Sequence, residues 1–217
     1  MRLYHFLNEE YGLLAIQNKR LKIGRINSFN DPFEFLHFDT ENYFTQKVIN
    51  DRKKRANRKC GVICFSKNFT SPVQWAHYAD SHNGICLVFD ISEQHLLEVQ
   101  YIEHRSCMDS FKEALELSVK GFMSLALSKK FQHWSYEEEV RLIINFDKPQ
   151  IGNGLLFKEF NDNLRLKEVI VGCKKNSTNI SHIKKIVRKN YSNVEIKRVA
   201  PSSNAFVMEL INHDKLN

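Results

Sequence analysis

The sequence predicts an α+β fold, with mixed and antiparallel sheets flanked by helices in one compact domain over residues 1–217. Three observations predict it. A length of 217 residues fits one domain. Hydrophobic residues (42%) and charged residues (26%) occur in ordinary globular proportions, which excludes a disordered chain or a fibre. Strand and helix patterns follow one another without the regular βαβ rhythm of a parallel sheet.

The chain begins as strand, helix and strand. Residues 3–6 form an apolar strand, residues 10–19 carry apolar residues at helical spacing, and residues 21–25 form a second strand. A polar loop follows, in which Pro32 disfavours helix at the preceding residue. After a basic stretch, residues 61–66 have the continuous apolar pattern of a buried strand.

A short helix and a tight turn come next. The pair Ser71-Pro72 is a cap and first turn, and the helix that it starts is expected to end near Asp80. The pair Asn83-Gly84 turns the chain into a strand at residues 85–89. Residues 99–103 are expected to pair with that strand.

The second half of the chain adds two amphipathic helices and four strands. Apolar residues recur every three or four positions in both helices. The second helix would be capped by Ser177 or Thr178. Residues 166–212 make a C-terminal strand–helix–strand extension. The elements are a helix at 109–127, strands at 140–145 and 169–172, a helix at 178–189, and strands at 194–199 and 206–211.

Composition restricts the class of protein. No window approaches the roughly 18 apolar residues of a membrane span, and the N-terminus lacks the apolar run of a signal peptide, so we expect a cytoplasmic protein with no membrane partner. Five cysteines are an odd number, which favours reduced thiols over a disulfide framework. No glycine-rich phosphate loop is present, which disfavours a nucleotide kinase or a classical dehydrogenase. The net charge of +7 favours phosphate-bearing partners.

The most informative segment contains Glu137, Glu139 and Arg141. Alternation along a strand would place these three side chains on one face, with neighbours roughly 6–7 Å apart. Two carboxylates beside a guanidinium stay ionised at neutral pH, and such a row suits the stabilisation of a developing positive charge. The alternative is a solvated strand face with surface ion pairs.

Other candidate residues have a structural interpretation beside the functional one. His5 lies in an apolar strand, where a histidine is more often a core residue than a ligand contact. The segment from Asn30 to Glu34 is either a loop that aims a carboxylate into a cleft or an Asx turn stiffened by proline. Trp75 and Tyr78 lie three apart on one helix face, where they would pack in the core or form an aromatic platform.

Two further patterns concern nucleic acid and metal. Basic residues from Arg52 to Lys59 would be a solvated helix face or an attraction for phosphates. A second basic set has the same two interpretations and consists of Lys174, Lys175, Lys184, Lys185, Arg188 and Lys189. The spacing of Cys60, Cys64, His77 and His82 matches no usual zinc pattern, so no metal is expected.

Six short blocks in order resemble the bacterial family called domain of unknown function 2971, over residues of about 3–172. The blocks are Leu3-Tyr4-His5-Phe6, Phe29-Asn30-Asp31-Pro32-Phe33-Glu34, Cys64-Phe65-Ser66, Trp75-x-x-Tyr78-Ala79, Gly84-Ile85-Cys86-Leu87-Val88-Phe89 and Trp134-x-Tyr136-Glu137-x-Glu139-x-Arg141. The joint occurrence of these blocks is specific although each is short. The family's label implies no activity.

The chain is more distantly similar to the ADP-ribosyltransferase superfamily. The similarity rests on a histidine in the first strand, an aromatic or serine position in the middle and a late glutamate. These would be His5, then Tyr78 or Ser66, then Glu137 or Glu139. The segment from Asn30 to Glu34 has no counterpart in that superfamily's usual pattern.

This second resemblance implies an ADP-ribosyltransferase-like fold and the use of NAD as a substrate. Glu139 or Glu137 would stabilise the cationic sugar, and His5 would hold a ribose. The acceptor would be nucleic acid or protein, and the protein would act as a bacterial toxin or a phage-defence effector. The residues expected to bind NAD are Tyr4, His5, Arg25, Asn30, Asp31, Glu34, Ser66, Trp75, Tyr78 and Arg141.

Two other functions stay open on the sequence. A non-catalytic nucleic-acid or nucleotide-binding module would bind through the basic residues and would tolerate the loss of Glu139. A nuclease or other hydrolase would use Asp31, Glu34, Glu137 and Glu139 with a divalent metal.

Overall fold

The computed structural model describes residues 1–35, 37–38, 43–92, 96–106, 112, 116, 118–147 and 154–211. The strands are β1 (Arg2–Leu7), β2 (Arg20–Lys22), β3 (Cys60–Ser66), β4 (Ile85–Ile91), β5 (Leu96–Glu98), β6 (Gln100–Ile102), β7 (Lys129–Phe131), β8 (Glu139–Asn145), β9 (Phe157–Glu159), β10 (Leu164–Val171), β11 (Glu195–Pro201) and β12 (Met208–Leu210). The helices are α1 (Glu9–Asn18), α2 (Tyr43–Lys59), α3 (Pro72–Tyr78), α5 (Val119–Leu127) and α6 (Ser177–Asn190), with 3-10 turns η1 (Ile26–Ser28) and η2 (Gln132–Glu137).

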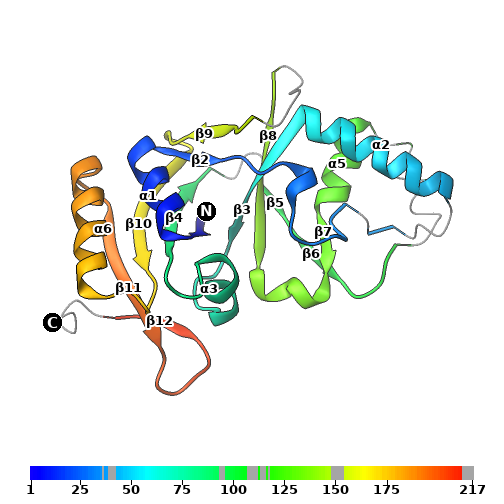
Figure 1. Cartoon of the computed structure of the whole chain (residues 1–217). Helices are drawn as coiled ribbons and strands as arrows, with labels where there is room; N and C mark the ends of the chain where they lie inside the picture. The colour runs from blue at the N-terminus through cyan, green and yellow to red at the C-terminus, as the bar shows by residue number, and fades with distance from the viewer. Residues whose placement is uncertain are drawn as a thin grey trace.

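A large mixed sheet runs through the molecule (Figure 1). In the described chain it has eight strands, in the order β12-β11-β10-β4-β1-β3-β8-β5. Neighbouring strands are antiparallel except β10 and β11, which are parallel. Two small two-stranded sheets, β2-β9 and β6-β7, lie beside it. The predicted α+β fold class with mixed sheets and flanking helices is confirmed.

The sheet opens in its middle, between β1 and β3. β1 pairs with β4 along its whole length, and β3 pairs with β8 from Cys60 to Ser66. By contrast, the described register between β1 and β3 is the single pair Tyr4–Ser66. Two halves of the sheet therefore diverge from that point, and the space between them is available to side chains and to a ligand.

The largest hydrophobic cluster extends across both halves of the sheet, from β10 and β4 to β3 and β8. In the half with β4 and β10, strand residues such as Leu87 pack against α1 and α6 through Ile16 and Ile183. In the half with β3 and β8, α2 and α5 contribute Ile49 and Phe122. A third cluster contains Trp75 of α3. Figure 1 shows α1 and α6 at one end of the molecule and α2 and α5 at the other. This shared cluster joins the two halves, although the described register between β1 and β3 is a single residue pair.

The predicted elements agree with the structure in most places. Residues 99–103 were expected to pair with β4, and this is wrong: β6 pairs with β7, because both edges of β4 are already taken by β1 and β10. The cap of α6 is Asn176, whose Oδ1 accepts from the Asn179 amide at 2.9 Å, and not Ser177 or Thr178.

Two other predicted elements are shorter in the described chain. The helix predicted at 109–127 is observed as α5, and residues 107–111, 113–115 and 117 lie outside the described residues. The strand predicted at 206–211 is limited to β12, and Phe206 is exposed before it. Within the described ranges, no helix has both the length and the apolar character that crossing a membrane requires.

Gly84 is required by a close approach of backbone at the start of β4. A Cβ atom there would lie 2.2 Å from the Leu7 carbonyl oxygen and 2.8 Å from the backbone of Ala79. We expect Gly84→Ala to lower the free energy of unfolding by about 1–3 kcal/mol, the usual cost of overpacking. Gly154→Ala is the matched control, because its added Cβ would meet no atom within 4 Å. Urea denaturation measures both variants, and equal stabilities would contradict the prediction.

Candidate functional site

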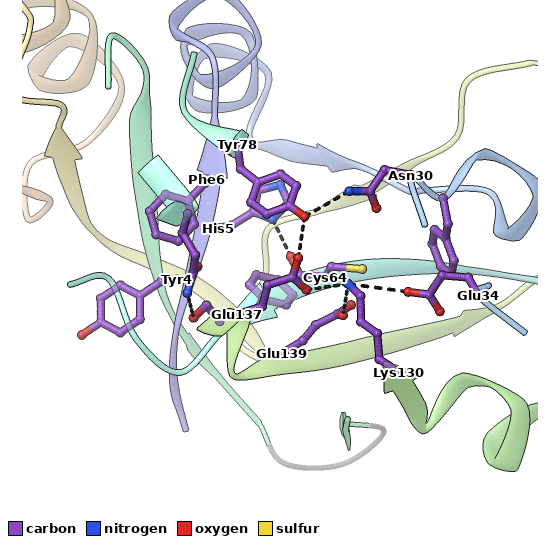
Figure 2. A pocket seen from close by; sticks show the side chains of 14 residues that line it. Tyr4, His5, Phe6, Asn30, Glu34, Cys64, Tyr78, Lys130, Glu137 and Glu139 are labelled. Atoms are coloured by element: carbon purple, nitrogen blue, oxygen red, sulfur yellow. Dashed lines mark hydrogen bonds and ion pairs between the residues drawn. The ribbon is translucent and has the colours of Figure 1, made fainter. Parts of the chain in front are cut away.

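A cavity of about 190 Å³ lies where β1 and β3 separate. Residues 4–6 of β1 and residues 64–66 of β3 form two of its walls. Figure 2 shows the polar side chains that point into this space from other elements. The residues that complete the lining are Phe29, Asn30, Glu34, Gln74, Tyr78, Lys130, Glu137 and Glu139. We call this space the first cavity.

A buried ion network forms the floor of the first cavity. The Lys130 Nζ lies 2.5 Å from Glu137 Oε2, 3.1 Å from Glu139 Oε2 and 3.6 Å from Glu34 Oε1. Arg141 donates from Nε to Glu139 Oε1 at 2.8 Å and from Nη2 to Glu34 Oε1 at 2.6 Å. Each of these five residues is 6% exposed or less. We call these five residues the ion network.

Strand geometry explains two of the five residues of the ion network. Glu139 and Arg141 lie two apart in β8, so alternation places both on one face, as the sequence predicts. The prediction that Glu137 belongs to the same strand is wrong: it lies in η2, and the left-handed residue Glu138 connects it to β8. The alternative of a solvated face with surface ion pairs is wrong, because Glu34 and Lys130 cover these side chains.

The ion network has more carboxylates than cations. Among the described residues it contains three carboxylates, from Glu34, Glu137 and Glu139, against the cations of Lys130 and Arg141. Burial opposes ionisation of Glu139, yet Arg141 and Lys130 outweigh burial and lower its pKa to about 2. Burial raises the pKa of Glu34 and of Glu137 despite the same cations. With all three carboxylates ionised, the ion network carries one net negative charge, and the first cavity is then complementary to a cationic ligand.

Tyr78 and Asn30 connect the ion network to the mouth of the first cavity. The Tyr78 hydroxyl donates to Glu137 Oε1 at 2.5 Å and accepts from Asn30 Nδ2 at 3.1 Å (Figure 2). Burial and the Glu137 carboxylate raise the pKa of Tyr78, so its hydroxyl keeps its proton. A ligand hydroxyl or amide can replace this donor on Glu137.

His5 bridges the gap between the diverging strands. Its Nδ1 lies 2.8 Å from the Cys64 carbonyl oxygen, which can only accept, so Nδ1 carries the proton. Burial lowers the pKa of His5, which keeps the ring neutral and leaves Nε2 as an acceptor. Burial and the charge of Glu139 raise the pKa of Cys64, so this neighbouring thiol is no thiolate nucleophile.

Most of the sequence-predicted site residues lie around the first cavity. His5, Tyr78, Glu137 and Glu139 come together there. Asn30, Glu34 and Ser66 also line it, and Arg141 supports two carboxylates from behind. The Tyr4 ring turns away from the carboxylates and packs on Phe69 with ring centroids 5.2 Å apart (Figure 2).

Besides Arg141, which lies behind the carboxylates, three predicted residues do not reach the first cavity. Trp75 is fully buried, with Nε1 donating to the Phe69 carbonyl at 2.7 Å, so it is a core residue and not an aromatic platform. Arg25 lines a separate cavity. Asp31 accepts from the Phe33 amide at 2.9 Å, which is the Asx turn of the alternative interpretation.

Two residues of the site have no signal in the sequence. Lys130 follows α5 in a chain with 32 Lys and Arg residues, and its position at the centre of three carboxylates depends on tertiary packing. Gln74 donates from Nε2 to Ser66 Oγ at 3.1 Å and to the Tyr136 carbonyl at 2.8 Å, which fixes η2 against β3. The fourth block of the family resemblance begins at Trp75 and therefore does not include Gln74.

The geometry bears on the two other functions considered. The Lys130 ammonium lies among the carboxylates that a hydrolase would use to hold a divalent cation, so the arrangement does not favour a metal there. Figure 1 shows α2 and α6, which carry the two basic runs, at opposite ends of the molecule.

Comparison with known proteins gives one match. Residues 74–142 match the model of a family described as protein of unknown function DUF2971, which confirms the resemblance to that family over these residues. They contain the last three of the six blocks, including Tyr78, Glu137, Glu139 and Arg141. No curated protein and no solved structure matches the chain.

Removing one cation from the ion network should destabilise the fold strongly. We expect Arg141→Met to lower the free energy of unfolding by about 3–5 kcal/mol, because Glu34 and Glu139 would stay buried without it. The control is Lys67→Met, because Lys67 pairs with Glu98 while both side chains are exposed, at 40% and 55%; it should cost at most about 1 kcal/mol. Similar losses in urea denaturation for both variants would contradict a buried network.

The low pKa of Glu139 predicts an acid dependence of stability. Its folded pKa of about 2 lies below the ordinary 4.5, so the unfolded chain binds the proton first as the pH falls. The stabilisation from this carboxylate is complete above pH 4.5 and is lost as the pH falls towards 2. We expect the stability difference between the wild type and Glu139→Gln to shrink over that range. A difference that does not vary with pH would disprove the assignment.

Proposed function

We propose that the protein breaks the bond between nicotinamide and ribose in NAD and transfers ADP-ribose to an acceptor or to water. The observation that carries this proposal is the convergence of His5, Tyr78, Glu137 and Glu139 on one cavity. These residues come from distant parts of the chain. Taken alone, each could serve only in packing or in an ion pair of the fold. Their meeting in one place supports a common task.

The charge of the first cavity suits the substrate. The nicotinamide ring of NAD is a cation, and the departing sugar passes through an oxocarbenium-like state that is also cationic. The excess carboxylate of the ion network attracts the nicotinamide cation and stabilises the oxocarbenium-like sugar. Burial strengthens both interactions. Because Lys130 and Arg141 hold the carboxylates in place, little reorganisation is needed when the positive charge develops on the sugar.

The size of the first cavity limits how much of NAD it would hold. Its volume of about 190 Å³ is smaller than the roughly 300–1,000 Å³ of sites that enclose drug-sized ligands. It would therefore hold the nicotinamide and the adjoining ribose, with the remainder of the dinucleotide outside. The Phe29 and Tyr78 side chains in the lining offer aromatic surface to the nicotinamide ring.

The proposed step breaks one bond and forms one bond. The carbon–nitrogen bond between ribose and nicotinamide breaks, and its electron pair leaves with the nicotinamide nitrogen, which becomes neutral. An oxygen or nitrogen of the acceptor then bonds to the ribose carbon and releases a proton. With water as the acceptor, the products are nicotinamide, ADP-ribose and that proton.

The two glutamates have different roles in this proposal. Both oxygens of Glu139 are held by Arg141 and Lys130, so it acts as a fixed negative charge. Glu137 faces Tyr78 and is the carboxylate that a ribose hydroxyl would reach. His5, with Nε2 as an acceptor, would bind a second hydroxyl. Because such a reaction consumes a shared cofactor, it would suit a toxin or phage-defence effector.

Nicotinamide release from NAD tests the proposal. We expect the purified protein, alone or with cell extract as a source of acceptor, to release nicotinamide. Glu137→Gln and Glu139→Gln should each lower the rate by about 10²–10³-fold, as losses of transition-state electrostatics do. Glu138→Gln is the matched control, because this exposed residue turns away to accept from Asn68 Nδ2 at 2.9 Å.

Two results would contradict the proposal. One is the absence of nicotinamide release under every acceptor condition. The other is an equal rate in Glu137→Gln, Glu138→Gln and the wild type. Circular dichroism of each variant checks that its secondary structure is retained, so that a lower rate of nicotinamide release cannot come from unfolding.

A further inference from the structure

A second cavity of about 280 Å³ lies on the other side of the Glu34–Lys130 ion pair. Neighbouring residues face the two cavities in turn: Glu34 lines the first and Phe33 the second. Lys130 lines both cavities, with its ammonium bonded to Glu137, whereas Lys129 and Phe131 of the same strand line only the second. The proposed reaction uses none of Phe33, Lys129 and Phe131.

His37 is the most unusual residue of the second cavity. It is 6% exposed, yet neither of its ring nitrogens has a hydrogen-bond partner within the described residues. Two unpartnered nitrogens in a buried ring are costly unless a ligand or water satisfies them. Burial, aided by the charge of Lys129, lowers the pKa of His37 to about 4, so at neutral pH the ring offers one donor and one acceptor.

The second cavity is also positively charged. The described partner of the Lys129 ammonium is the neutral Ser106 hydroxyl at 3.2 Å, and no described carboxylate pairs with it. Arg105 contributes a guanidinium that lies 5.0 Å from the centre of the Phe33 ring. One carboxylate, that of Glu103, lines the cavity among these groups. The charge therefore favours an anionic ligand.

Aromatic rings form the mouth of the second cavity. Phe33 is 53% exposed and Phe131 is 40% exposed, although both are large apolar residues. Exposed aromatic rings beside cationic side chains are the combination that binds nucleotides, by stacking on the base and pairing with the phosphate. A volume of about 280 Å³ is at the lower end of the range for small-molecule sites, about 300 Å³.

We propose that the second cavity binds a nucleoside monophosphate, with the phosphate between Lys129 and His37 and the base against Phe131. The phosphate accepts from the Lys129 ammonium and from one nitrogen of His37. The other His37 nitrogen accepts from a ribose hydroxyl. This site is independent of the proposed reaction in the first cavity.

Isothermal titration calorimetry with adenosine monophosphate tests the proposal. We expect the wild type to bind adenosine monophosphate more tightly than inorganic phosphate or adenosine. Inorganic phosphate lacks the contacts of the base and ribose, and adenosine lacks those of the phosphate. Lys129→Met should weaken binding by about tenfold or more, because it removes a charge-assisted hydrogen bond to the phosphate. Lys129→Arg should retain most of the affinity, because arginine can donate the same kind of bond. Phe131→Ala, at the exposed mouth, should weaken binding of adenosine monophosphate but not of phosphate.

Two controls separate this site from the rest of the molecule. Glu137→Gln changes the first cavity and should leave the affinity for adenosine monophosphate unchanged. Lys185→Ala removes an exposed charge on α6, at the far end of the molecule, and should also have no effect.

Three results would overturn the proposal. They are the absence of binding at millimolar adenosine monophosphate, equal affinities in Lys129→Met and Lys129→Arg, and a loss in Glu137→Gln without a loss in Lys129→Met. The last of these would place the nucleotide in the first cavity.

Discussion

The pairing of Lys130 and Arg141 with three buried carboxylates is the interaction on which the site depends. A buried charge without a partner costs several kcal/mol, so each member of the network fixes the element that carries it. Arg141 holds β8 against the loop of Glu34, and Lys130 holds β7 against η2. A further bond from Arg141 Nη1 to the Leu127 carbonyl, at 2.8 Å, connects the end of α5. These polar contacts add to the backbone pairing between β3 and β8 in this half of the molecule.

The opening between β1 and β3 gives this network access to a ligand. Had the two strands paired along their length, residues 4–6 and 64–66 would have satisfied one another and closed the space. Instead, the His5 ring takes the place of a ladder bond by donating to Cys64, so the gap is bridged without being filled. The hydrophobic cluster that extends from β4 to β3 and β8 holds the two sides of the gap in place. A preorganised negative cavity is the result, and electrostatic catalysis requires such an environment.

The sequence predicts the parts of the site that follow from local periodicity. Glu139 and Arg141 share a face because a strand alternates, and the fold class follows from the order of apolar patterns. Trp75 and Tyr78 show where such reasoning fails: they are three apart on α3, yet one enters the core and the other the first cavity, because the short helix lies at the boundary between them. Lys130 has no local signal, since only the tertiary fold brings it to the carboxylates. Burial could not be predicted either, and it turns a possible surface pair into the ion network.

The two cavities have opposite charge because of the same alternation. In the loop, Phe33 and Glu34 face different cavities, and in β7 so do Lys129 and the Lys130 ammonium. The Glu34–Lys130 pair therefore forms a boundary between the carboxylates of the first cavity and the Lys129 and Arg105 side chains of the second. Because like charge repels, a phosphate is disfavoured in the first cavity and a pyridinium ring in the second. The wall that separates the two spaces also determines which chemical group each of them admits.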